Sequence, residues 1–194
     1  MKQAAIGVRV HSGWGAVVAV SRADDGPEIL ERKHITIIDP TAAGTKQPFH
    51  FAEKLSLAKA EKHISECAAA SGRLAVVALG DLLEGLRGRG CRVESCALLL
   101  ASGRALPVLP DILASHALIH TAEGEFFRRV FREAFEQLRV RVTGFRERGL
   151  EENASPRVLQ RISGLGKAIG PPWTVDEKMA ALAAWILLSG KSAS

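Results

Sequence analysis

The stretch AIGVRVHSGWGAVVAVS, residues 5–21, decides the fold of this chain. Valine and isoleucine dominate Ala5–Val10, and valine and alanine fill Gly15–Ser21, as is typical of two β-strands, with a Ser-Gly turn between them. A third strand is expected over Glu28–Ile38, after an Asp-Asp-Gly-Pro turn. The amino end is therefore predicted to form an antiparallel β-meander.

Helical and strand-like segments alternate after the meander. Asp39–Phe51 contains prolines and glycine and is interpreted as a loop. Glycine at position 72 is expected to bend or divide the helix that follows this loop. The further expected elements are a helix over Leu57–Arg87, a strand over Arg92–Ala101, a helix over Ser115–Leu138, a strand over Val140–Phe145, and helices over residues 155–168 and 174–188.

The order β-β-β-α-β-α-β-α, with an extra C-terminal helix, resembles the ribonuclease H-like fold. That resemblance implies an α/β domain with a mixed five-stranded sheet, in which two later strands run parallel to the first. Residues 1–190 are expected to form this single domain, and residues 191–194 a disordered tail. The phrases SHALIHTAEG, residues 115–124, and GPPW, residues 170–173, also resemble a bacterial protein family, which implies no particular activity.

The acidic residues depart from those of the ribonuclease H-like nucleases. Those enzymes hold two metal ions with several carboxylates, the first on the opening strand. Here Ile6–Val10 contains no carboxylate, and the strand ending at Ala101 is followed by Ser102 instead of an acid. Two-metal nuclease chemistry is therefore not expected from this chain.

Composition indicates a globular protein with an excess of positive charge. The chain has 194 residues, of which 47% are hydrophobic and 24% charged, and its formal net charge is +5. Arginines cluster between residues 128 and 148 and would attract nucleic acid or another phosphate-bearing partner, although a solvated helix face also explains them. Three cysteines without a C-x-x-C pair, and no long apolar segment, favour a cytoplasmic protein without a membrane span.

Ligands of open α/β sheets bind beyond the carboxyl ends of the parallel strands. In this chain that rule predicts a phosphate- or carboxylate-binding edge, where backbone N–H groups, hydroxyls and guanidinium groups converge. The alternative is a set of simple turns and a surface ion pair. The predicted edge residues are His11, Ser12, Ser102, Gly103, Arg104, Arg146 and Glu147.

One helix face carries a second candidate site. His116, His120 and Glu123 stand at i, i+4 and i+7 and so share one face, on the stripe predicted to face the sheet. Two histidines and a carboxylate at this spacing could hold one divalent metal ion such as zinc or iron. The alternative is that the histidines bond to Glu123 or to backbone carbonyls and complete the core.

Three functional hypotheses follow. The leading one is a ribonuclease H-like domain without the nuclease acids, which binds a phosphate-bearing ligand or nucleic acid at the sheet edge. The second is a hydrolase with a single metal on His116, His120 and Glu123, in which Arg104 or Arg146 polarises the substrate. The third is a structural module that associates with itself or with another protein.

Overall fold

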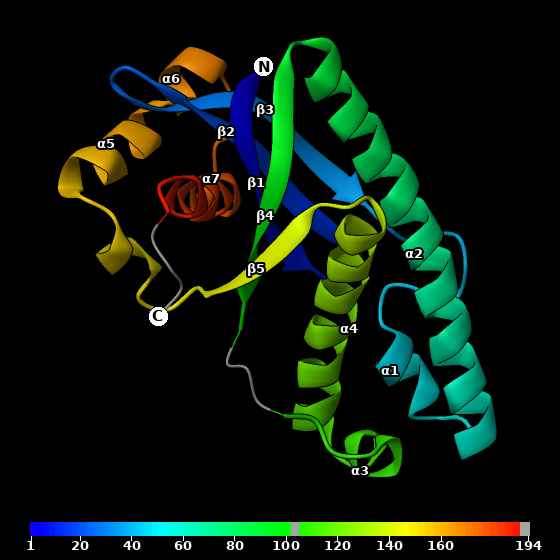
Figure 1. Cartoon of the computed structure of the whole chain (residues 1–194). Helices are drawn as coiled ribbons and strands as arrows, with labels where there is room; N and C mark the ends of the chain where they lie inside the picture. The colour runs from blue at the N-terminus through cyan, green and yellow to red at the C-terminus, as the bar shows by residue number, and fades with distance from the viewer. Residues whose placement is uncertain (102–104, 191–194) are drawn as a thin grey trace.

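A computed structural model describes residues 1–101 and 105–190 of the chain. Figure 1 shows a single sheet with helices on both of its faces. The five strands are β1 (Lys2–His11), β2 (Trp14–Ala23), β3 (Gly26–Thr36), β4 (Cys91–Leu100) and β5 (Arg141–Arg146). The expected tail, residues 191–194, and the segment Ser102-Gly103-Arg104 lie outside the described residues.

The sheet has the strand order β3-β2-β1-β4-β5. β1 pairs antiparallel with β2, and β2 antiparallel with β3, so the predicted meander is confirmed. β4 then runs parallel to β1, and β5 parallel to β4. The carboxyl ends of β1, β4 and β5 therefore meet at one edge, as the predicted arrangement requires.

Two long helices cover one face of the sheet. They are α2 (Leu57–Gly88) and α4 (His116–Gln137), and they pack against each other as well as on the strands. Ile6 and Val8 of β1 are fully buried beneath them with Phe127 and Phe131 of α4. Residues of β1 alternate between the two faces, so Ala5 points into the second core on the other side.

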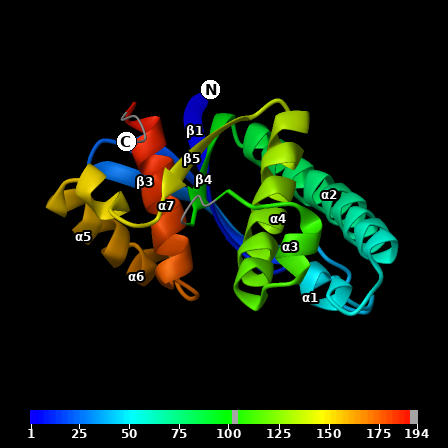
Figure 2. The ribbon, with the colours of Figure 1, turned by 90° about the horizontal axis from the view of Figure 1, so that it is seen from below.

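The other face is covered by α7 (Val175–Leu188), flanked by α5 (Pro156–Gly164) and α6 (Gly166–Ile169). Figure 2 shows the two helical layers on opposite sides of the sheet. Alanines fill the buried side of α7, and they let the helix backbone approach β1 closely. A Cβ added at Gly7 would lie 1.8 Å from the carbonyl oxygen of Ala180, so this contact requires glycine.

Short helices account for most differences from the expected elements. The predicted loop Asp39–Phe51 contains the start of α1 (Pro48–Ala52), and α3 (Leu109–Leu113) precedes α4. The 3₁₀ turn Leu150–Asn153 follows β5. The expected division of α2 at Gly72 is wrong: the helix is continuous, because both of its halves pack on the same core.

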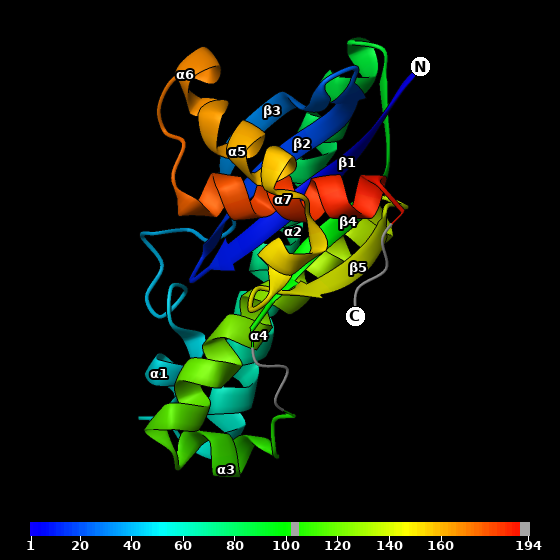
Figure 3. The same ribbon diagram turned by 90° about the vertical axis from the view of Figure 1, so that its left-hand side faces the viewer.

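No helix among the described residues is long and apolar enough to cross a membrane. At one end of the molecule, α1, α3 and the first turns of α4 lie together beyond the sheet (Figure 3). This end holds the histidine cluster described next.

Candidate metal centre and sheet edge

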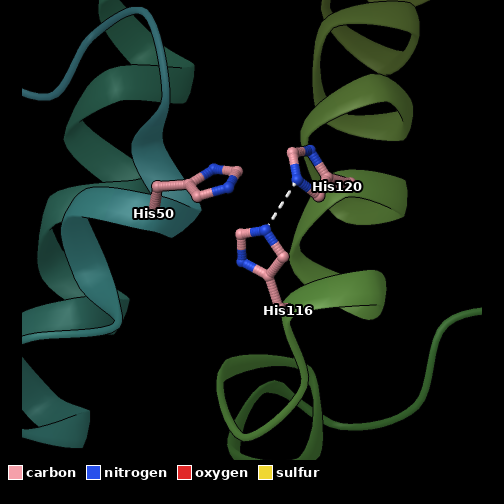
Figure 4. Close-up of side chains that lie close together, drawn as sticks. All are labelled: His50, His116 and His120. Carbon is pink, nitrogen blue, oxygen red and sulfur yellow. Dashed lines mark hydrogen bonds between the residues drawn. The ribbon is translucent and has the colours of Figure 1, made fainter.

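Three histidines from two helices converge at the end of the molecule beyond the sheet. His50 lies on α1, and His116 and His120 lie on the first turns of α4. One ring nitrogen of each lies within 4.8 Å of the corresponding nitrogens of the other two. Figure 4 shows the three rings facing one another across the gap between the helices. We call this group the histidine cluster.

The spacing within the cluster approaches that of a metal site. The Nε2 atoms of His116 and His120 are 3.0 Å apart, and the centroid of the His50 ring lies 4.7 Å from that of His120. Two nitrogen ligands of a tetrahedral zinc ion, each bonded at about 2.0–2.1 Å, would stand about 3.3 Å apart. His116 and His120 thus already have nearly the separation of two ligands on one ion.

A buried carboxylate holds His50 in place. Oε1 of Glu123 accepts hydrogen bonds from the backbone N–H groups of Phe49 and His50, at 2.9 and 3.1 Å. The same oxygen lies 3.1 Å from Nδ1 of His50, which leaves Nε2 of that ring free to face the cluster. Glu123 therefore provides the acceptor for the first N–H groups of α1, whose N-terminal residue Gln47 makes no side-chain cap.

The environment of Glu123 is unusual for a carboxylate. The residue is only 4% exposed, and its Oε2 atom has no hydrogen-bond partner among the described residues. Burial raises the pKa of Glu123, although hydrogen bonds from His50 and Phe49 oppose that change. A positive charge close to His50 would stabilise the ionised carboxylate, and a divalent metal ion on the ring's other nitrogen would supply one.

The prediction that His116, His120 and Glu123 all lie on the buried face of α4 is correct for Glu123 and wrong for the two histidines. Glu123 is buried as expected, but His116 and His120 are exposed to solvent and do not face the sheet. The reason is that α4 begins beyond the sheet edge, where α1 and α3 are its neighbours instead of strands (Figure 3). Glu123 lies behind His50, and the third imidazole of the cluster comes from His50, which the sequence analysis did not select.

No local sequence pattern links His50 to the other two histidines, because it precedes them by 66 positions or more. The available indication was the phrase Gln47-Pro48-Phe49-His50, in which proline suits the first turn of a helix. A helix of five residues is too short to show a periodic pattern.

The predicted sheet edge contains a network of charged side chains. Arg9, on the opening strand, bonds to Glu147 just after β5 at 2.9 Å and to Asp176 at the start of α7 at 2.5 Å. His11 lies 3.0 Å from the same oxygen of Asp176 and stacks on the ring of Trp14. The hydrogen bonds that Arg9 donates to Glu147 and to Asp176 raise its pKa, the bond to Glu147 most, although burial opposes this effect.

At this edge the opening strand carries an arginine instead of a carboxylate. The Arg9 guanidinium lies between two acidic groups from distant parts of the chain and donates hydrogen bonds to both, so its single positive charge offsets one of their two negative charges. Of the predicted edge residues, the structure joins His11 and Glu147 through this network, while Ser12 lies in the β1–β2 turn and Arg146 ends β5. Ser102, Gly103 and Arg104 lie outside the described residues.

Comparison with known proteins identifies the fold. No protein-family model matches the chain, and no curated protein matches it. Among solved structures, Thermus thermophilus RuvC in complex with a Holliday junction substrate matches with a TM-score of 0.54 and 10% identity, over 97% of this chain and 95% of that one. A second structure of Thermus thermophilus RuvC matches with a TM-score of 0.49 and 11% identity, over 94% and 92% of the two chains.

The first of these matches confirms the predicted α/β class and the ribonuclease H-like mixed sheet. This chain and the junction-bound RuvC match over almost the whole of both chains, so their helices and strands share one arrangement. At this identity the match establishes the fold alone.

Proposed function

We propose that this protein is a metal-dependent hydrolase of phosphate esters, with one transition metal ion of the zinc class bound by His50, His116 and His120. The observation that carries the proposal is the convergence of three imidazoles, one of which is held by a buried carboxylate. Glu123 would not touch the ion but would hold the ring of His50 in its orientation.

The type and number of ligands favour this chemistry. Imidazole nitrogens suit zinc, iron and similar metals better than magnesium or calcium, which prefer oxygen. Three protein ligands leave one position of a tetrahedral ion for water, as in catalytic zinc sites. A metal ion bound in this way lowers the pKa of water to about 7 and so supplies hydroxide at neutral pH.

The partner of His50 supports a metal ligand role over a core role. Metal-binding histidines commonly donate their second ring N–H to a carboxylate, which fixes the tautomer and the ring orientation. Nδ1 of His50 faces Glu123 in this manner, and Nε2 faces the other two histidines. Because His116 and His120 are exposed, a substrate could reach the ion from solvent.

Phosphate esters are proposed as substrates on grounds of charge and fold. The chain carries a net charge of +5, and the structurally similar RuvC was solved with a Holliday junction substrate. In the hydrolysis, the oxygen of water forms a bond to phosphorus, the ester P–O bond breaks, and the departing alcohol takes up a proton. Nucleic acid is the substrate that this reasoning favours.

The second candidate function is binding of a phosphate-bearing ligand or nucleic acid at the sheet edge without catalysis. It is favoured by the exposed Arg146 at the end of β5 and by the match to a DNA-bound structure. Arg9 already forms ion pairs with Glu147 and Asp176, so its guanidinium is not available to bind phosphate. Affinity for short DNA and RNA across a range of salt concentrations tests this candidate, which requires a steep loss of binding as salt rises.

Hydrolysis assays separate the two candidates. Protein stripped of metal is supplied with zinc or manganese and incubated with bis(4-nitrophenyl) phosphate and with labelled DNA and RNA oligonucleotides. We expect product to form with metal and to fall to background in a His116→Ala, His120→Ala double variant. His34→Ala is the matched control, since His34 stacks on Trp14 outside the cluster. Equal product from the double variant and the wild type would refute a catalytic role for the cluster.

A further inference from the structure

A cavity lies at the opposite end of α4 from the histidine cluster. Its volume is about 720 Å³, and it is bounded by Met1, the last two turns of α2, the segment that follows α4, and the first residues of β4 and β5. Since α4 is 22 residues long, roughly 30 Å separate the cavity from the histidines. Figure 1 shows the carboxyl end of α2 beside the beginning of β4, and the carboxyl end of α4 beside the beginning of β5.

Arginines dominate the charge of this cavity. Arg87, Arg139 and Arg141 all line it, and within the described part of the chain none of the three side chains has an ion pair or a hydrogen bond. Arg92 also lines the cavity, but it pairs with Glu94 at 2.5 Å, so these two charges cancel. Three lining arginines, all of them exposed, are therefore left without a counter-charge.

The helix ends nearby do not account for the three arginines. The carboxyl ends of α2 and α4 each carry roughly half a negative charge, so together they offset about one of the three positive charges. The backbone N–H groups of Arg89 and Leu138 donate hydrogen bonds to carbonyl oxygens in the last turns of these helices. A net positive charge of about two remains in the cavity.

The backbone at Arg139 provides a separate observation. Its φ angle is +61°, and it is the only described residue other than glycine in the left-handed region. Glycine is the usual residue at such a position after a helix, and Gly90 occupies the corresponding position after α2 with a φ of +74°. An arginine here is unfavourable for the fold, which suggests that its side chain serves another purpose.

Apolar side chains form the floor beneath the arginines. Leu83 of α2, Leu138 and Val140 line the cavity together with Val93 of β4. A cavity of this size suits a small organic molecule, and arginine forks match phosphate oxygens. From these observations we propose that the cavity binds a nucleotide, with its phosphates on Arg87, Arg139 and Arg141 and its base or sugar on the apolar floor.

The phosphate group could come from a free nucleotide or from the end of a nucleic-acid strand. Isothermal titration calorimetry of the metal-free chain, residues 1–194, with ADP, pyrophosphate and a 5′-phosphorylated tetranucleotide distinguishes these sources. We expect ADP to bind more tightly than pyrophosphate, because only ADP contacts the apolar floor. Tighter binding of the tetranucleotide than of ADP would assign the site to strand ends.

Two variants test the proposal independently of folding. Arg139→Gly relieves the left-handed backbone, so we expect its melting temperature to equal or exceed that of the wild type while ADP affinity falls at least about tenfold. Arg129→Met is the matched control: Arg129 lies on α4 outside the cavity, beside Glu133, and its loss should leave ADP affinity unchanged.

The proposal is overturned if ADP does not bind, or if it binds Arg139→Gly and the wild type equally. Since these titrations need no metal and no histidine, their failure would leave the proposed hydrolase unaffected. The reverse also holds, because loss of hydrolysis in the histidine variants does not alter the arginine cavity.

Discussion

Replacement of Glu123 separates its role in folding from its role at the metal. In Glu123→Ala, the buried N–H of Phe49 and two N–H groups of His50 lose their common acceptor. A buried donor without a partner costs about 1–3 kcal/mol, and water can reach the half-buried His50 at less cost. With the lost packing of a side chain in the core, we expect the free energy of unfolding to fall by about 2–4 kcal/mol.

Glu123→Gln is the informative partner of that variant. Its amide oxygen can still accept from the backbone N–H groups of α1, so we expect metal-free stability within about 1 kcal/mol of the wild type. The negative charge behind His50 is lost, however, and loss of a carboxylate that bonds to a metal-binding histidine weakens metal binding about 10–100-fold. That range corresponds to about 1.4–2.7 kcal/mol of binding free energy.

Two measurements check these expectations. Urea unfolding in the presence of a chelator gives the stability of each variant without metal, and competition with a chromophoric chelator gives its zinc affinity. Unchanged zinc affinity in Glu123→Gln would refute the proposed carboxylate–histidine–metal arrangement. Unchanged stability in Glu123→Ala would refute the role of Glu123 at the start of α1.

Three further predictions concern the rest of the fold. A hydrogen bond from Lys2, and then one from Ser21, lower the pKa of Glu28, so its stabilising contribution is present above about pH 4.3 and is lost as the pH falls through the lowered pKa. The stability difference between wild type and Glu28→Gln in urea should therefore shrink toward pH 3. Gly7→Ala should cost about 3 kcal/mol or more, because the added Cβ meets the backbone of α7, whereas Gly72→Ala, in open space, should be neutral or stabilising by up to about 1 kcal/mol; equal melting temperatures would contradict this packing. Arg9→Met leaves two carboxylates without their cation and should lower stability by about 1–2 kcal/mol, less at high salt, and a loss that is independent of salt would contradict the electrostatic explanation.

The sequence was most informative where local patterns determine structure. The meander follows from strand-forming residues separated by turn sequences, and both long helices follow from apolar periodicity. The ribonuclease H-like arrangement could therefore be predicted from the order of these elements. Gly72 misled the prediction, because the propensity of one residue is small beside the packing of a 32-residue helix on the core.

The candidate sites depend on contacts between distant segments. His116 and His120 were selected from their spacing on one helix, but His50 joins them only because α1 folds back onto α4. The pairing of Arg9 with Asp176 spans 167 positions, so no local pattern indicates it. The same limit applies to the arginine cavity, whose walls come from two helices and two strands.

Metal content is the most direct test of the proposed centre. The chain of residues 1–194 is purified without chelators and dialysed first against zinc and then against metal-free buffer. Its metal content is measured by elemental analysis beside that of the His50→Ala, His116→Ala/His120→Ala and His34→Ala variants. We predict one zinc-class ion per chain in the wild type and in His34→Ala, and a loss of that ion in the other two. Absence of bound metal from the wild type, or its full retention in the double variant, would contradict the proposal.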